Sequence, residues 1–253
     1  DSLLARHARG LGGRDLPDPV VDISALAELR GITENDRGFR IGGLTTWSGI
    51  QKTTLPPAFD GLKAAAAQVG GLQIQNAGTI AGNLCNASPA ADGVPPLLAL
   101  DASVEVASNA RGIRRVSLAA FLQGVRRTDL AADELVTAII VPEPSPDARS
   151  AFEKLGSRSY MVISITMTAA VVECDESGVI RRAAVAVGAC SAVAQRLPRL
   201  ESDLVGQSAH AISVTPDHLA PLSPIDDVRG SGDYRLDAVA EQIARAVRRA
   251  SAR

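Results

Sequence analysis

The residues best suited to hold a ligand lie in one short stretch of the first half of the chain, between Gln75 and Asp92. Glycines at positions 78 and 82 allow close approach to the backbone, because glycine has no Cβ. The short polar side chains could exchange hydrogen bonds with a ligand, and they are Thr79, Asn83, Asn86, Ser88 and Asp92. Composition alone favours an ordinary turn, since Gly, Asn, Ser and Pro punctuate turns, so the order of the residues has to decide.

Composition places the chain among soluble globular proteins of one or two domains. It has 253 residues, of which 46% are hydrophobic and 21% are charged. The net charge of -2 gives no indication of binding to nucleic acid or to a membrane surface. No apolar run reaches the roughly 18 residues that span a bilayer, and no signal peptide is visible. We therefore expect a cytoplasmic protein.

Cysteine and histidine show no metal-binding pattern. The three cysteines are isolated and form no C-x-x-C motif, so neither a disulfide framework nor an iron–sulfur site is predicted; they are Cys85, Cys174 and Cys190. A reducing cytosol fits this usage. The histidines lack ligand spacing and are expected to be hydrogen-bonded or solvated; they are His7, His210 and His218.

The elements that must position the polar stretch can be read from periodicity. An alanine-rich helix is predicted over 62–69, and Gly70-Gly71 closes it just before the stretch begins. Alternating apolar residues predict strands, and these cover 103–108, 113–116 and 135–141. Shorter strands and helical turns complete the first half, with strands at 20–23 and 39–43 and helical turns at 25–29, 46–51 and 118–122.

A change of pattern follows the segment Pro142–Asp147, which contains three prolines and reads as a linker. Beyond it we predict three strands and then two helices, at 151–155, 166–173, 179–187, 198–205 and 236–249. Strands followed by helices indicate an α+β domain. We accordingly place a first domain at 1–146 and a second at 147–253.

The order of residues between Gln75 and Asp92 resembles the flavin signature of the FAD subunits of molybdenum hydroxylases, the xanthine dehydrogenase and carbon monoxide dehydrogenase group. The family pattern runs approximately Ile-Arg-Asn-x-Gly/Ala-Thr-Ile-Gly-Gly-Asn and then Ser-Pro-x-x-Asp. Similar segments extend along nearly the whole chain and include 20–32, 152–158 and 223–229. The resemblance implies an α+β flavoprotein with a PCMH-type FAD domain followed by a CO dehydrogenase flavoprotein C-terminal-like domain.

The resemblance also implies which residues contact FAD: Thr79, Ile80, Gly82, Asn83, Ser88, Asp92, Val136 and Lys154. Asp92 would accept hydrogen bonds from ribityl or ribose hydroxyls, and backbone amides in the glycine turn would form a concave anion site. Val136 would lie against the isoalloxazine ring. Lys154 would lie near the polar edge of that ring, where a cation stabilises the anionic reduced flavin. Plain core packing for Val136 and a surface position for Lys154 are the alternatives.

Several positions depart from the family pattern. Gln75 replaces the usual Arg, Ala81 a usual Gly, Val162 a frequent Asp and Val69 an aromatic residue. The family's N-terminal β-α-β segment, with a second glycine-rich loop for the FAD pyrophosphate, has no counterpart, because Asp1 aligns with the end of that loop. The pair at 12–13 reads as a plain loop. We therefore expect an N-terminally incomplete FAD domain.

Taken together, the resemblance implies the FAD subunit of a multi-subunit oxidoreductase. Electrons would leave the substrate at a molybdenum cofactor in a large subunit, cross [2Fe-2S] clusters in a small subunit, reach FAD here and pass to NAD⁺ or another acceptor. No catalytic acid or base is then expected in this chain. A non-catalytic assembly scaffold that has lost FAD and a stand-alone FAD oxidoreductase are the other hypotheses. The substrate stays open among purines, aldehydes, N-heterocycles and CO, since its pocket would lie on the molybdenum subunit.

Overall fold

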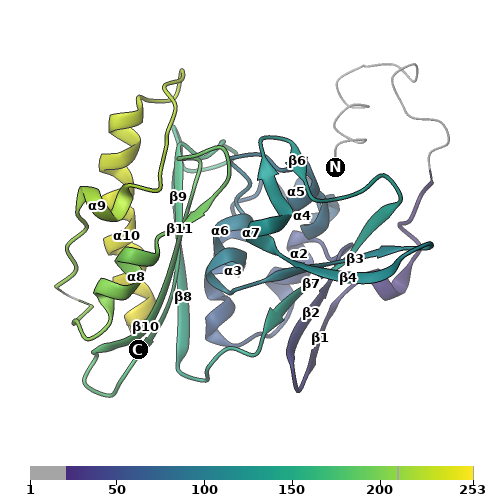
Figure 1. Cartoon of the computed structure of the whole chain (residues 1–253), viewed down its shortest axis with the longest axis horizontal. Coiled ribbons are helices and arrows are strands. Elements are labelled where there is room, and N and C mark those ends of the chain that lie inside the picture. Colours follow the sequence, from purple (N-terminus) through teal and green to yellow (C-terminus); the bar gives the residue numbers. More distant parts are fainter. Residues whose placement is uncertain (1–20, 210, 253) are drawn as a thin grey trace.

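The computed structural model describes residues 21–209 and 211–252. The expectations for His7, Val20, His210 and the loop at 12–13 lie outside these residues. Within them, a layer of helices separates a five-stranded antiparallel sheet from a four-stranded one, and a long C-terminal helix covers the far side of the smaller sheet (Figure 1). In the described part of the chain, no helix is both long and apolar enough to cross a membrane.

The five-stranded sheet belongs to the first half of the chain. Its order is β1 (Ile32–Asn35), β2 (Gly38–Gly42), β7 (Glu134–Pro142), β3 (Ser103–Ser108) and β4 (Gly112–Ser117). All neighbouring strands are antiparallel, and Ile139 in the central strand lies between Ile41 and Val104. All three side chains are fully buried, so this face of the sheet packs against the helices. A small two-stranded ribbon, β5 (Leu122–Gly124) with β6 (Arg127–Thr128), follows the helical turn α7 (Leu118–Phe121).

Short helices fill the space between the two sheets. They are α2 (Trp47–Lys52), α3 (Asp60–Ala66), α4 (Leu72–Ala77), α5 (Ile80–Asn86) and α6 (Val94–Ala99), with the 3₁₀ turn η3 (Pro57–Phe59). A second 3₁₀ turn, η2 (Ala27–Leu29), precedes β1. Alanine and leucine dominate their buried positions, which fits a core poor in aromatic residues. The side chain of Trp47 is fully buried among them and anchors α2 in this layer.

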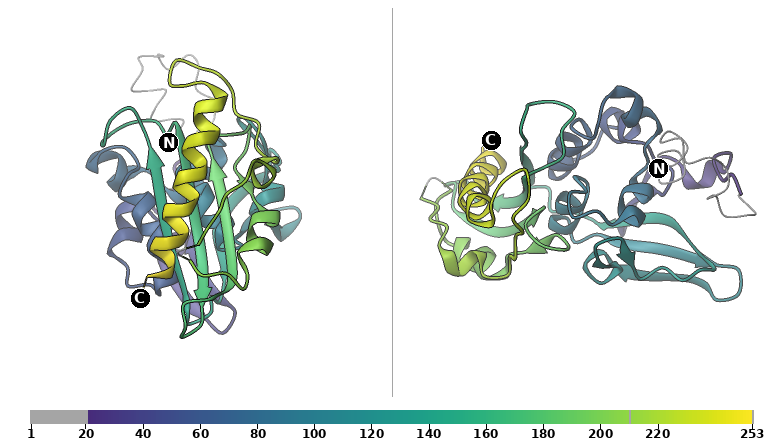
Figure 2. Two further views of the ribbon diagram at one scale, coloured as in Figure 1. Left: turned by 90° about the vertical axis from the view of Figure 1, so that its left-hand side faces the viewer. Right: turned by 90° about the horizontal axis from the view of Figure 1, so that it is seen from above.

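The four-stranded sheet belongs to the second half, in the order β11 (Gln195–Arg196), β10 (Ile180–Gly188), β9 (Thr166–Cys174) and β8 (Ala148–Leu155). On one face lie α8 (Pro198–Leu204) and α10 (Gly232–Ser251), and on the other lie α3 and α6 (Figure 2). The short helix α9 (Pro216–Leu219) leads into the loop before α10. Both faces are therefore covered, and this explains the unbroken run of small apolar residues at 183–188.

One apolar core joins the two halves. Phe152, Met167 and Ala184 of the second sheet belong to the same cluster of buried side chains as Leu62 and Leu97 of the first half. Residues on the opposite face, such as Val185 and Val187, pack instead with α8 and α10. The alternation of side chains along each strand assigns them to these two clusters. The second sheet is consequently held in one orientation against the helices of the first half.

Most predicted elements are confirmed, but the strand predicted at 20–23 and the start of the last helix are corrected. Residues 21–23 form no strand, and Val21 is 76% exposed because no neighbouring strand pairs with it. The helical turn predicted at 25–29 is the 3₁₀ turn η2, and the amide of Ser24 before it bonds to the Asp22 carboxylate, 2.8 Å away. The last helix begins earlier than predicted, since Ser231 caps α10 by accepting from the amide of Tyr234.

Candidate functional site

The stretch predicted to hold a ligand is mostly helical, so the expectation of a turn there was wrong. Helix α4 ends at Ala77, and α5 begins directly after Thr79, whose Oγ1 accepts from the amide of Gly82 at 3.1 Å. Thr46 caps α2 in the same way, and the two threonines form an antiparallel bridge. The missed signal was this threonine cap, which satisfies a free amide and lets a Gly- and Asn-rich segment continue as helix.

The first four amides of α5 are already bonded within the protein. The amides of residues 80–83 lie 3.0 to 3.2 Å from their acceptors, which are Thr45 O, Gly43 O, Thr79 Oγ1 and Thr79 O. Gly78, which precedes the helix, has an ordinary φ of −68°. These four amides are therefore not free to form the concave anion site predicted from the glycine turn. A ligand at this position would meet side chains rather than free backbone donors.

Asn83 carries a buried polar atom that lacks a partner. Its Oδ1 accepts no hydrogen bond in the described part of the chain. Gly93 lies against it, because a Cβ at that position would come within 3.0 Å of this oxygen and 2.5 Å of the Trp47 ring. Leaving a buried acceptor unsatisfied is costly, so the donor of a bound molecule would be favoured here. This observation fits the predicted role of Asn83 in a cofactor site.

Val136 lies in β7 next to the start of α5. Gly43 packs between these two segments, since a Cβ on Gly43 would lie 2.8 Å from the carbonyl oxygen of Val136 and 3.3 Å from the Cβ of Ala81. Val136 itself is buried, as is Ile80, whose side chain belongs to the apolar core. The structure thus brings Val136 together with the first turn of α5. Ile80 could offer a ligand little beyond its backbone.

Asp92 and Lys154 form a buried ion pair between the two halves of the chain. The Lys154 Nζ and Asp92 Oδ2 atoms are 2.6 Å apart, and the side chains are only 5% and 9% exposed. Lys154 also donates to the carbonyl of Gln68 at 3.3 Å. Burial raises the pKa of Asp92, while Lys154 and the hydroxyl of Ser164 act against that rise. The alternative of a surface lysine at this position is excluded.

Ser164 is the residue of this cluster that the sequence did not reveal. Its hydroxyl donates to Asp92 Oδ1 at 2.6 Å and is buried. Ser88 begins the turn that carries Asp92, and its own Oγ accepts from the amide of Ala90. Gln75, at the position of a usual Arg, is buried and bonded to Gln51 and to the carbonyl of Ala67. These contacts tie the polar stretch to its surroundings.

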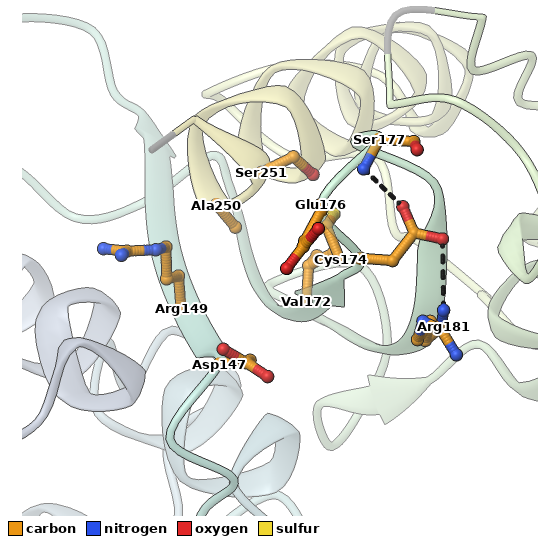
Figure 3. A pocket seen from close by; sticks show the side chains of 10 residues that line it. Asp147, Arg149, Val172, Cys174, Glu176, Ser177, Arg181, Ala250 and Ser251 are labelled. Carbon is orange, nitrogen blue, oxygen red and sulfur yellow. Dashed lines mark hydrogen bonds and ion pairs between the residues drawn. The ribbon is translucent and has the colours of Figure 1, made fainter.

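A cavity of about 50 Å³ adjoins the ion pair and is lined by Gln68, Lys154, Gly156 and residues 158–162. A larger opening of about 700 Å³ lies elsewhere, between the start of β8, the β9–β10 turn and the end of α10 (Figure 3). Both acidic and basic side chains line it, among them Asp147, Glu176 and Arg181. None of the predicted site residues lines the larger opening.

Metal-ligating groups do not gather in the described part of the chain, where no three His, Cys, Asp or Glu side chains could hold one ion. Cys85, Cys174 and Cys190 are free thiols. His218 is hydrogen-bonded, as expected, since Nδ1 accepts from the amide of Thr215 and Nε2 lies 3.0 Å from the Asp203 carboxylate.

The two halves of the chain match two known protein families. The family described as the FAD binding domain in molybdopterin dehydrogenase matches residues 12–144. The CO dehydrogenase flavoprotein C-terminal domain matches residues 150–250. The chain belongs to the family of FAD-binding subunits of molybdopterin dehydrogenases. The predicted family and the two-domain α+β flavoprotein fold are therefore confirmed.

Individual proteins similar to this FAD-binding subunit agree with the family assignment. The nicotinate dehydrogenase FAD-subunit of Eubacterium barkeri is 37% identical over 75% of this chain, which spans 65% of that protein's length. The putative xanthine dehydrogenase FAD-binding subunit of Escherichia coli is 34% identical, and the match covers 86% of this chain and 76% of that protein. The solved Cu,Mo-CO dehydrogenase superimposes with a TM-score of 0.88 at 26% identity, covering 99% of this chain and 87% of the other.

Proposed function

We propose that this chain carries FAD and transfers electrons within a cytoplasmic molybdenum hydroxylase complex. A large molybdopterin-binding subunit would oxidise the substrate, and a small [2Fe-2S] subunit would deliver the electrons to the FAD held here. NAD⁺ or another acceptor would then receive them. The family match carries this proposal, and the unpartnered oxygen of Asn83 supports a bound cofactor. We place the FAD domain at 1–146 and the second domain at 147–253.

The residues that would hold FAD lie along two neighbouring segments. The first turn of α5 would supply Thr79, Ile80, Gly82 and Asn83, and Val136 lies beside this turn. The turn after α5 would supply Ser88 and Asp92, and Lys154 reaches the same place from β8. When bound, FAD supplies the redox chemistry, and the protein supplies binding, orientation and electrostatics.

Lys154 and Asp92 retain capacity for a ligand despite their mutual bond. A lysine ammonium has three N–H donors, and two of them are used, by Asp92 Oδ2 and by the carbonyl of Gln68. Each carboxylate oxygen of Asp92 accepts one hydrogen bond and keeps a second lone pair. A fixed ammonium in a buried site favours negative charge beside it more strongly than one in water.

The proposal is tested most sharply by Asn83→Leu. This change keeps the side-chain shape and removes an oxygen that has no partner in the FAD-free chain. We expect the FAD-free protein to keep or slightly raise its melting temperature, while FAD binds at least about tenfold more weakly, the effect of about 1.4 kcal/mol. Titration of the full-length protein with FAD, followed by flavin fluorescence, measures the affinity.

The matched control is Asn109→Leu, because Asn109 is exposed in the turn between β3 and β4 and is not one of the proposed FAD residues. It should leave FAD affinity unchanged. A wild-type protein that is colourless and takes up no added FAD would overturn the proposal and favour the assembly scaffold. Purification with its partner subunits at native mass would argue against a stand-alone FAD oxidoreductase.

A further inference from the structure

Three side chains from three separate parts of the chain form one buried hydrogen-bonded unit. Asp92 follows α5, Lys154 lies in β8, and Ser164 lies just before β9. Ser164 donates to one carboxylate oxygen and Lys154 to the other, each over 2.6 Å. The carboxylate is thus held at both oxygens, which prevents it from rotating. Ser164 is therefore placed to decide where the Lys154 ammonium sits.

The backbone at Ser164 is itself fixed from the far side. Arg235 of α10 is buried and donates to the carbonyl oxygens of Ile165 and Ala189 and to the carboxylate of Asp227. The amide of Ile165 bonds to the carbonyl of Leu155, the residue after Lys154, at 2.8 Å. The residue next to Ser164 is consequently bonded on both sides. The backbone that carries Ser164 is therefore held in place, with the Ser164 hydroxyl bonded to Asp92.

We propose that Ser164 is a positioning residue of the FAD site, which acts by holding Asp92 and through it Lys154. This inference rests on the proposed function, because it assigns Ser164 a part in the same cofactor site. Arg235, in the same second domain, supports Ser164 through the carbonyl of Ile165. Asp92 belongs to the first domain, so the unit fixes the cation of the second domain that would face the flavin against the first domain.

The charged groups that face Asp92 determine how the ion pair responds to pH. Lys154 is the charged partner that faces it. Nearby arginines bond elsewhere: Arg158 donates to the carbonyl of Met161, and Arg235 to the groups described above. Protonation of Asp92 would break the pair with Lys154. FAD affinity should thus be present above the pKa of Asp92 and be lost as the pH falls through it.

Ser164→Ala tests this role through the pH profile of FAD binding to the full-length protein. The hydroxyl favours the charged carboxylate, so its loss raises the pKa of Asp92 further. The acid-side midpoint of FAD affinity should move upward by about one pH unit. A purely structural loss would instead lower the affinity equally at every pH. Ser164→Thr, which keeps the hydroxyl, should restore the original midpoint.

Two further variants make the result decisive. Ser157→Ala is the matched control, because Ser157 is exposed in the same connection between β8 and β9, and its midpoint should equal that of the wild type. Asp92→Asn should abolish the acid-side transition. If Ser164→Ala binds FAD with the wild-type midpoint, the positioning role is wrong while the proposed function stands. If the wild type itself binds no FAD, the proposed function fails first.

Discussion

At the residue scale, the site depends on how closely a few backbone atoms and side chains approach one another. Gly93 has an ordinary helical φ of −75°, so its value lies in its missing side chain rather than in its conformation. The Trp47 ring and Asn83 Oδ1 occupy the space where a Cβ would stand. Gly49, two residues after Trp47, is different, because a Cβ there would make only ordinary contacts, the nearest at 3.4 Å.

These two glycines should respond oppositely to alanine. Gly93→Ala pushes against a buried indole ring and should destabilise the protein by about 1–3 kcal/mol. Gly49→Ala lies inside α2 and should stabilise it by about 0.5–1 kcal/mol, because alanine lowers the entropy lost on helix formation. Urea denaturation of each variant measures both signs. A neutral Gly93→Ala variant would show that the Trp47 ring moves aside without cost.

At the element scale, threonine and serine caps decide where the short helices begin. Thr79 starts α5 and Ser231 starts α10, each by accepting a hydrogen bond from the amide three residues later. The first cap lies in the proposed FAD site, whereas the second begins the helix that covers the opposite face of the second sheet. The same local interaction therefore serves two distinct regions.

The two caps separate stability from cofactor binding. Thr79→Ala and Ser231→Ala should each cost about 1 kcal/mol of unfolding free energy, because each leaves a helix amide without its acceptor. Only Thr79→Ala should also weaken FAD binding, and Thr79→Ser should restore both properties. Denaturant melts and FAD titration of the same samples provide the comparison. An equal loss of FAD affinity in both alanine variants would mean that general destabilisation, and not the α5 cap, controls binding.

At the scale of the whole molecule, the two halves share one core, so we expect them to unfold together. Phe152 of β8 packs in the cluster that contains the helices of the first half. The Asp92–Lys154 pair and the Ser164 bond cross between the halves within the same region. The family boundary near residue 147 therefore separates two sequence units that form one packed body in this chain.

Phe152→Ala should reveal that shared core. Removing a buried phenylalanine leaves a cavity and should cost about 3–5 kcal/mol. Scanning calorimetry should show one transition in the wild type and one transition, at lower temperature, in the variant. Ile113→Ala, at a position 69% exposed on the edge strand β4, should leave the transition nearly unchanged. Two resolved transitions in Phe152→Ala, one of them unshifted, would show that the halves are independent.

Local patterns in the sequence were enough to predict most elements. The alternation at 103–108 and 135–141 gave strands β3 and β7, and the alanine-rich run at 62–69 gave α3, because these signals depend only on neighbouring residues. The order of residues from Gln75 to Asp92 was enough to place the chain in its family. Such local signals do not predict which side chains distant in the sequence will pair with one another.

The tertiary structure alone decided which polar groups meet. Lys154 and Ser164 lie 62 and 72 residues from Asp92, so no local pattern could join them, and burial made their pairing obligatory. It also decided that the amides of residues 80–83 are bonded internally, because two of their acceptors lie at Gly43 and Thr45 on a neighbouring segment. The sequence by itself determined the elements and the family, whose signals are short in range. The arrangement of the site followed from packing, which brings distant residues within hydrogen-bonding distance.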